Sequence, residues 1–399
     1  MKIGDMCTKI CSGGTPASSI KEYYNGNIPW LNTKEVCFNR VYNTEKKITQ
    51  LGYESSAAKL IPSNSVIVAM YGATAAKCCI NKIPLTTNQA CCNLIIDETK
   101  GDYNFIYYYI CYKYNELLSL TNGAAQQNLN TQIIKDFEIP SLSLEKQKAI
   151  AAVLSALDNK IEVNCAINKN LEATAQAIFK SWFVDFEPFG GVMPANAQIT
   201  ELKELCSVVT KGTTPTTLGM SFRDYGVNFI KAESILQNHS FDVQKFSYID
   251  NETNEILRRS ILNVGDILFT IAGTLGRFSL VDASILPANT NQAVAIIRPD
   301  TSLISSEYLY SFFVGNWHSI YYTSRIQQAV QANLSLTTIK TLPVILLDYK
   351  EKQEYTELIT PLFEKIRQNL SQNQRLAEIR DALLPKLMSG EIDVSQVKI

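Results

Sequence analysis

The tetrapeptide TNQA at residues 87–90 recurs letter for letter at residues 290–293, and it anchors a repeat that runs along the chain. The other matched stretches keep the same order: GGTP at 13–16 with GTTP at 212–215, PWL at 29–31 with NFI at 228–230, VIVAMYGATAAK at 66–77 with ILFTIAGTLGR at 267–277, QNL at 127–129 with ANL at 332–334, and EKQ at 145–147 with EKQ at 351–353. The offset drifts from 199 to 206 residues, so one long unit has been duplicated and has diverged. This period is far too long for a solenoid of short stacked repeats.

The first part of each copy has the pattern of a mixed α and β domain. Short β-branched and aromatic runs between Gly, Asn and Pro turns predict strands at residues 66–71, 91–96, 267–271 and 293–297. An aromatic-rich segment at residues 103–119, matched by residues 307–321, predicts a short helix in each copy.

A long helix is expected to close each copy. From residue 144 to residue 183 the seam positions follow a four-three spacing, and the same spacing holds from Tyr355 to Leu387 in the second copy. Pro361 is expected to kink the second helix, and Pro385 to end or bend its last turn. A seam over five heptads favours pairing of the two helices; the alternative is that each helix packs on its own domain.

Two asparagines interrupt each seam at the same places. If the helices are antiparallel, Asn164 and Asn168 lie opposite Asn373 and Asn369. Buried asparagines at seam positions fix the register of a helix pair at some cost in stability. The alternative is that all four side chains are exposed to solvent at the edge of the seam.

The predicted fold is therefore α+β, with two similar globular domains joined by two long antiparallel helices and related by an approximate two-fold axis. We assign the domains to residues 1–143 and 188–347, and the helices to residues 144–187 and to residues 348–399 with the C-terminal tail. Such an object presents two similar but different surfaces at a fixed distance. That geometry suits a protein that reads two different half-sites of a DNA target. It also offers two equivalent docking faces to a second protein.

Composition excludes several classes of protein. The 399 residues are 46% hydrophobic and 19% charged, which is typical of a globular protein, and no apolar run reaches the length of a membrane span. The first residues lack an apolar signal core, so we expect a cytoplasmic location. The net charge of −1 is unusual for a protein that binds DNA alone, so a DNA-binding function would need a partner that supplies positive charge.

The chain lacks the motifs of an enzyme. It has ten cysteines but no pair of CxxC motifs, so we expect reduced core thiols and no zinc site. It has no Asn-Pro-Pro-aromatic run for amino-methyl transfer, no Walker motif and no glycine-rich cofactor loop. His239 and His318 are the two histidines, and neither lies in a catalytic pattern. Pro299 and Asp300 near Glu307 fit a strand-to-loop turn better than a nuclease metal site.

Taken in order, these motifs resemble those of the specificity (S) subunit of a type I restriction–modification system. The resemblance rests on the duplicated series of Gly-Thr-Pro, WLNTKE at residues 30–35, GTLGR at 273–277, TNQA, QQNL at 126–129, the EKQ-opened helix and SWFVDF at 181–186. It implies two target-recognition domains, each reading one half of a bipartite DNA site. It also implies a non-catalytic subunit on which two methyltransferase subunits dock and which translocase–endonuclease subunits can join. The protein itself would need no cofactor, because S-adenosylmethionine and ATP would bind only the partner subunits. The first copy departs from the pattern at Ala75 and Ala76, where the second copy has the turn residue Gly276.

DNA contacts are expected among basic residues on loops that differ between the copies, because cations bind phosphates and groove edges. The candidates are Lys34, Arg40, Lys46, Lys47 and Lys77 in the first domain, and Lys211, Arg223, Lys231, Arg258, Arg259 and Arg277 in the second. Lys46–Lys47 and Arg258–Arg259 are expected at comparable places before the glycine-turn strands. Each candidate could equally be ordinary surface charge.

The identical residues of the two copies are interpreted differently. Asn88 and Gln89 recur unchanged as Asn291 and Gln292. Two domains that read different sequences should differ in their base contacts. We therefore expect these four residues to hold the fold together or to contact the DNA backbone.

Two other functions also fit the sequence. The near-neutral charge and the 19 tyrosines also suit a coiled-coil scaffold or adaptor with two protein-binding domains, which would show no dependence on DNA. A closer variant is the specificity protein of a related enzyme with fused methyltransferase and nuclease.

Overall fold

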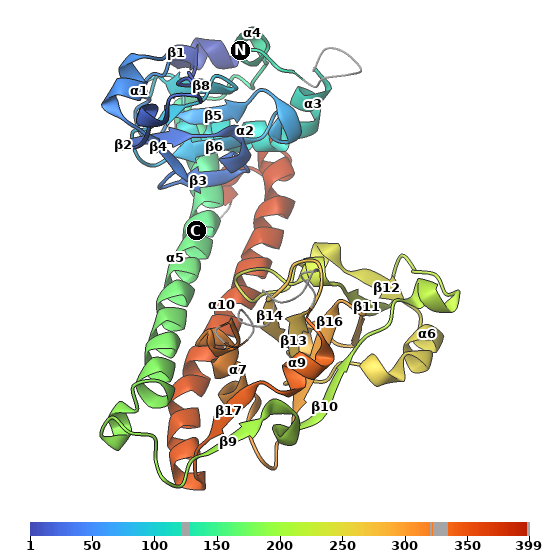
Figure 1. Cartoon of the computed structure of the whole chain (residues 1–399). Coiled ribbons are helices and arrows are strands. Elements are labelled where there is room, and N and C mark those ends of the chain that lie inside the picture. Colours follow the sequence, from blue (N-terminus) through green and yellow to red (C-terminus); the bar gives the residue numbers. More distant parts are fainter. Residues whose placement is uncertain (121–127, 320, 322–333, 397–399) are drawn as a thin grey trace. The chain divides into compact units, whose positions relative to one another are not determined.

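The computed structural model describes residues 1–120, 128–319, 321 and 334–396. The chain forms two compact units, one made of Met1–Glu162 with Asn373–Ile399 and the other of Val163–Gln372 (Figure 1). We call them unit 1 and unit 2. Each unit contains one globular domain and a segment of both long helices, α5 (Leu144–Phe183) and α10 (Tyr349–Ser389). None of the helices in the described part of the chain is long and apolar enough to cross a membrane.

The domain of unit 1 contains two sheets. The larger has the strand order β1 (Cys7–Ser12), β8 (Cys91–Ile96), β5 (Val66–Ala69), β6 (Cys78–Asn81) and β3 (Asn39–Val41). The smaller has the order β4 (Lys46–Ile48), β2 (Tyr24–Leu31) and β7 (Thr86–Thr87). The central strands β5, β6 and β8 are buried along almost their whole length, as their β-branched and cysteine residues favour.

Most of the short helices of unit 1 begin at a residue whose side chain caps the helix. The short helices are α1 (Gln50–Glu54), α2 (Tyr103–Tyr112), α3 (Tyr114–Ser119) and α4 (Thr131–Asp136). Asp102 caps α2 by accepting a hydrogen bond from the Phe105 amide at 2.8 Å. The single helix expected over residues 103–119 is thus two helices that meet at Lys113.

The core of unit 1 lies between the larger sheet, α2 and parts of both long helices. Ile150 and Leu154 of α5 and Leu387 of α10 are buried in the same cluster as the strand residues. Both long helices therefore contribute to the core of this domain.

The domain of unit 2 has a similar arrangement, but in the residues that the structure describes its larger sheet has four strands instead of five, and it has an additional two-stranded sheet. The larger sheet has the strand order β10 (Cys206–Lys211), β16 (Val294–Pro299), β13 (Ile267–Thr270) and β14 (Phe278–Leu280). A second sheet has the order β12 (Ser247–Ile249), β11 (Val227–Ile230) and β15 (Ala288–Thr290). A third sheet pairs β17 (Pro343–Leu346) with β9 (Gln198–Glu201). Its helices are α6 (Asn251–Ile256), α7 (Ser306–Val314) and α9 (Leu336–Lys340).

Strand pairing confirms that the two domains are copies of one fold. The β1–β8 ladder has an irregularity between Cys7 and Lys9, and the β10–β16 ladder has one between Cys206 and Val208. β2 pairs in parallel with β7, and β11 pairs in parallel with β15. A shared bulge and a shared parallel pair would not arise from composition alone.

The two long helices are antiparallel, as the seam predicts. In unit 2, Asn369 Nδ2 donates to Asn168 Oδ1 at 2.7 Å, and Asn164 Nδ2 donates to Gln372 Oε1 at 2.8 Å. Residue numbers therefore increase along α5 in the direction in which they decrease along α10. Asn164 and Asn369 are buried, so these seam asparagines are not exposed side chains at its edge.

The helices also pack on the domains, so both interpretations of the seam hold in part. In unit 2, Phe179 and Phe183 of α5 share a core cluster with Tyr355 and Phe363 of α10 and with the strands. α10 runs without interruption through Pro361 and Pro385 and ends at Ser389. The expectation that Pro385 ends the helix is therefore wrong. Burial of the residues that follow Pro385, Leu387 and Met388, holds the last turn in place.

Candidate nucleic-acid interface

The repeated motifs of unit 1 converge on one edge of its sheets. We call this the motif edge of unit 1 and define it by residues 13–16, 31–35, 70–77 and 87–90. The Gly14 amide donates to the Thr87 carbonyl at 2.9 Å, and the Asn88 amide donates to the Leu31 carbonyl at 3.0 Å. Motifs that are far apart in the sequence thus form one surface of adjoining turns.

Two further contacts bring the glycine turn onto this edge. Thr74 Oγ1 donates to the Thr33 carbonyl at 2.9 Å, and the Met70 amide donates to the Ala90 carbonyl at 2.8 Å. The Leu129 amide donates to the Met70 carbonyl at 2.8 Å, which places the end of the QQNL motif here as well. Gln126 and Gln127 of that motif, and Ala332 and Asn333 of its second copy, lie outside the described residues.

Unit 2 has the equivalent surface, the motif edge of unit 2, defined by residues 212–215, 230–234, 271–277 and 290–293. Thr274 Oγ1 donates to the Ala232 carbonyl at 2.9 Å, in the same way as Thr74 Oγ1 donates to the Thr33 carbonyl in unit 1. The Ile271 amide donates to the Ala293 carbonyl at 2.8 Å. The two edges therefore share one backbone framework.

Close approach of two turns explains the repeated glycine of the Gly-Thr-Pro motif. A Cβ atom on Gly13 would lie 2.1 Å from the Thr87 carbonyl oxygen, and one on Gly212 would lie 1.8 Å from the Thr290 carbonyl oxygen. Neither distance is sterically possible, so only glycine allows the two turns to pack.

The residues that are identical in the two copies hold this framework together, as the interpretation of the repeat predicts. The Thr15 hydroxyl donates to Gln89 Oε1, and the Thr214 hydroxyl donates to Gln292 Oε1. In both copies the asparagine closes its own turn: the Ala90 amide donates to Asn88 Oδ1 at 3.1 Å, and the Ala293 amide donates to Asn291 Oδ1 at 3.2 Å. Their side chains are occupied within the protein in the same way twice.

The glycine turn keeps its conformation where the sequence departs from the pattern. Gly276 has φ = 84°, and Ala76 at the same place in unit 1 has φ = 65°. Both are left-handed, although an alanine is strained there. The missing glycine has therefore not changed the backbone conformation at this position.

Three of the candidate cations of unit 1 lie at its motif edge. Lys46 pairs across strands with Trp30, whose indole N–H donates to the Gly14 carbonyl at 2.9 Å. Lys34 forms an ion pair with Glu45, and that hydrogen bond raises the pKa of Lys34. Lys77 ends the glycine turn, with its Nζ atom 3.8 Å from the sulfur of Cys37. Lys47 follows Lys46 on β4 and is exposed on the opposite face of the strand.

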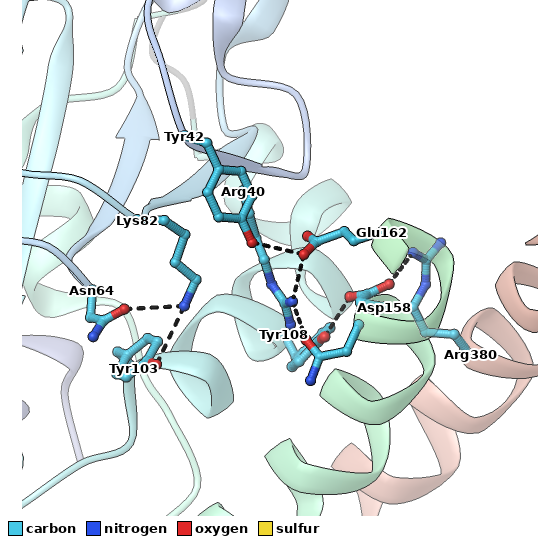
Figure 2. A network of polar contacts seen from close by, with 10 residues as sticks. Arg40, Tyr42, Asn64, Lys82, Tyr103, Tyr108, Asp158, Glu162 and Arg380 are labelled. Carbon is cyan, nitrogen blue, oxygen red and sulfur yellow. Dashed lines mark hydrogen bonds and ion pairs between the residues drawn. The ribbon is translucent and has the colours of Figure 1, made fainter. Parts of the chain in front are cut away.

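Arg40 is placed differently, because its side chain packs against α5. It is 6% exposed, and its Nη1 atom donates to Asn159 Oδ1 and, at 3.3 Å, to Glu162 Oε2 (Figure 2). The Tyr42 hydroxyl donates to the same Glu162 oxygen at 2.8 Å. In this structure Arg40 links β3 to the helix and offers no exposed guanidinium to a phosphate.

A second set of contacts continues this network toward α10. Arg380 Nη1 donates to Asp158 Oδ1 at 2.7 Å, and the Tyr108 hydroxyl donates to Asp158 Oδ2 (Figure 2). Burial, followed by the charge of Asp158, raises the pKa of Tyr108. The phenol therefore stays protonated as a donor, and the network holds α2, α5 and α10 together.

In unit 2, two candidate cations meet at the Gly-Thr-Pro turn. Lys211 is the exposed last residue of β10, and Arg259 Nη2 lies 3.4 Å from its carbonyl oxygen and 3.3 Å from Thr213 Oγ1. Arg258 is exposed beside Arg259 in a short 3₁₀ helix, Arg258–Ser260. This is the clearest group of candidate cations on either edge.

The remaining candidates of unit 2 have partners within the domain. Lys231 lies over the Phe222 ring, with its Nζ atom 4.7 Å from the ring centre, and Arg277 Nη1 donates to the Ile235 carbonyl at 2.9 Å. Arg223 donates twice to Asp250 Oδ2, at 2.9 and 2.8 Å. Hydrogen bonds from Thr253 and from Arg223 lower the pKa of Asp250 to about 2. Asp250 therefore stays ionised and remains the partner of Arg223.

The expected equivalence of Lys46–Lys47 and Arg258–Arg259 is wrong. Lys46 and Lys47 lie in β4, whose counterpart in unit 2 is β12 (Ser247–Ile249). The arginine pair comes later, after α6. Strand register aligns Ile48 with Ile249, and this register could not be derived from the spacing of charges.

Tyr71 is a further candidate contact residue, and its type is not basic. It is 39% exposed directly before the glycine turn of unit 1, where unit 2 has Ala272. A tyrosine can contact both phosphates and base edges. The signal was available in the repeat, because the two copies differ at the position next to a shared glycine.

These features define a class of protein: a duplicated recognition protein with two similar α+β domains, each presenting the same framework of turns with different exposed side chains. The chain belongs to the family of the type I restriction modification DNA specificity domain, which matches residues 1–173 and 194–380. The resemblance found in the sequence is thereby confirmed.

Individual relatives agree with this assignment. The type I restriction enzyme MjaIX specificity subunit of Methanocaldococcus jannaschii is 26% identical, over 98% of this chain and 92% of the relative. The HindI specificity subunit of Haemophilus influenzae is 26% identical over 64% of this chain and 70% of the relative. The crystal structure of a type I restriction–modification S subunit from M. genitalium has the same fold, with a TM-score of 0.59, 17% identity and coverage of 97% of this chain and 95% of that one.

Proposed function

We propose that each motif edge reads one half of an asymmetric bipartite DNA site, and that α5 and α10 dock two methyltransferase subunits. The observation that carries the proposal is that the two motif edges share one backbone framework but present different exposed side chains. Gln89 and Gln292 make the same contact in both copies, whereas Lys46 in unit 1 and Lys211 with Arg259 in unit 2 have no counterpart in the other copy. A shared framework with different exposed cations suits two readers of different sequences.

The charge of the chain favours a partner that shares the DNA. A net charge of −1 supplies little of the phosphate neutralisation on which DNA affinity depends. The long helices carry exposed apolar side chains, among them Ile379 in unit 1 and Val163 and Leu358 in unit 2. Exposed apolar residues on both helix segments support docking of a protein partner. Chemistry, S-adenosylmethionine and ATP would then belong to the partner subunits, and this chain would be the non-catalytic reader.

The test is to co-express the full chain with a candidate methyltransferase subunit and to map methylated bases in the host DNA. The variant Lys46→Gln/Lys47→Gln should relax or change one half of the motif, and Lys211→Gln/Arg259→Gln should change only the other half. Removing phosphate contacts should also reduce the salt dependence of DNA binding by about one unit of slope per contact.

Matched controls exist shortly before β1 and β10. Lys2 and Lys203 precede β1 and β10, at the strand ends opposite the Gly-Thr-Pro turns, and each is already paired with a carboxylate. Lys2→Gln and Lys203→Gln should leave the motif unchanged. If both halves changed together in either double variant, the proposal of two independent readers would be wrong. A stable complex with the methyltransferase subunit that shows no dependence on DNA, in the intact chain or in the variants, would favour the scaffold function instead.

A further inference from the structure

Unit 2 contains a cavity of about 270 Å³ that the proposed function does not use. It lies between α5, α7, α10 and the turn that carries His239. Its apolar lining consists of Leu280, Tyr310, Val314, Phe363, Ile366 and Leu370. The volume is slightly below the usual range for ligand pockets, so it suits a ligand of one or two rings.

Charged side chains line the same cavity. Lys169 and Glu172 come from α5, and Arg367 comes from α10. Glu172 Oε1 lies 3.3 Å from His239 Nε2, so its carboxylate already has a partner. His239 has the left-handed φ of 61° and stacks on Phe278 with ring centres 3.9 Å apart, which fixes this partner in place. Two cations and one occupied carboxylate leave the lining with an excess of positive charge.

Arg367 is the group that points to a ligand. Its Nη2 atom lies 3.6 Å from Glu307 Oε1, which is longer than a good hydrogen bond. Its Nη1 atom is buried without a hydrogen-bond partner. A buried guanidinium N–H without an acceptor is costly, and because Arg367 lines the cavity, a small rotation of its side chain brings the group to a ligand oxygen bound there.

We propose that this cavity binds a small monocarboxylate with an apolar, ring-sized body. The body lies on the floor formed by Phe363, Ile366 and Leu370, and the carboxylate accepts from the Arg367 guanidinium. Such a ligand contacts α5, α10 and the recognition domain at once. The proposal is independent of DNA reading, since none of the motif-edge residues lines the cavity.

The probes for the test are 1-naphthoate and its neutral analogue 1-naphthamide, titrated into the full chain by calorimetry. With the intact protein, naphthoate should bind about tenfold more tightly than naphthamide, because a charge-assisted hydrogen bond is stronger than a neutral one. Arg367→Met should abolish this preference while naphthamide still binds. Arg375→Met, which changes an exposed arginine of the same helix, should behave as the intact protein does.

A second variant keeps the test decisive if Arg367→Met does not fold. Cys165 lines the cavity and is exposed, so Cys165→Phe adds bulk at the opening without filling the core. It should weaken both probes by about tenfold or more through steric exclusion. The proposal is overturned if naphthoate shows no saturable binding, if the preference for naphthoate survives in Arg367→Met, or if Cys165→Phe binds both probes normally.

Discussion

Asp158 of α5 and Arg380 of α10 form an ion pair in which the guanidinium Nη1 donates to the carboxylate Oδ1 at 2.7 Å. The two side chains are 14% and 28% exposed, so the pair is largely shielded from water. The other oxygen of Asp158 accepts from Tyr108 of α2. One carboxylate therefore connects three helices of unit 1.

Removing Arg380 should destabilise unit 1. Among the described residues, Arg380→Met leaves the carboxylate of Asp158 with the Tyr108 hydroxyl as its hydrogen-bond donor. We expect a loss of about 2 kcal/mol, below the range for a fully buried pair because Arg380 is partly exposed. Urea unfolding measures this loss. Arg375→Met on the exposed side of the same helix is the control and should change the free energy of unfolding by less than about 0.5 kcal/mol. Equal effects of the two variants would show that the ion pair contributes nothing.

The asparagine pair of the seam should behave non-additively. Asn369→Leu removes the donor to Asn168 Oδ1 and should cost about 1 to 2 kcal/mol, because a polar atom of the seam loses its partner. The double variant Asn168→Leu/Asn369→Leu should recover most of this loss, because two leucines replace the pair at a helix–helix seam. A double-mutant cycle by chemical denaturation checks the coupling. Simple addition of the two single effects would contradict it.

His318 should make unit 2 sensitive to acid. Burial among Phe269, Phe278 and Phe313, together with the charge of His239, lowers its pKa to about 4. In the unfolded chain a histidine titrates near pH 6.5, so between pH 6.5 and 4 the unfolded state binds more protons and stability falls as the pH falls. The loss should reach about 3 kcal/mol at pH 4.

The matching variant is His318→Phe, which keeps an aromatic ring in the cluster and removes the titration. Its free energy of unfolding should change less between pH 7 and pH 4.5 than that of the intact protein. Parallel pH profiles of the two proteins would show that His318 does not cause the acid sensitivity.

The glycine turns of the two copies offer a comparison of backbone strain. Gly276→Ala places a side chain at φ = 84° in open space, so the expected cost of about 1 kcal/mol is conformational only. Ala76→Gly relieves the same strain in unit 1 but removes a fully buried methyl group, so its net effect should be close to zero. Thermal unfolding of the two variants measures both. A neutral Gly276→Ala would show that the turn carries no strain.

Local patterns in the sequence were sufficient to predict the repeat, the strands and the first long helix. The expected helix from residue 144 to residue 183 is α5 itself, because its seam is a local pattern with many repeats. The end of α10 was not predictable in this way. Pro385 is a local signal to stop, but the burial of Leu387 and Met388 in a domain made of distant residues outweighs it.

The candidate site was predictable in its framework and less so in its cations. Identity of Gln89 and Gln292 between the copies indicated a structural role, which the contacts to Thr15 and Thr214 confirm. Nothing in the sequence near Arg40 indicates that it packs against Glu162, because the two are 122 residues apart. The type of a residue predicts its chemistry, whereas the face on which it lies depends on tertiary packing.

The division of the chain has a consequence for its synthesis. Unit 2 is continuous, from Val163 to Gln372, whereas unit 1 combines Met1–Glu162 with Asn373–Ile399. Leu387 and Arg380, which complete the core and the ion pair of unit 1, leave the ribosome more than 200 residues after Asp158. The domain that is translated first must therefore wait, with part of its apolar surface uncovered, until the domain translated second has all its residues.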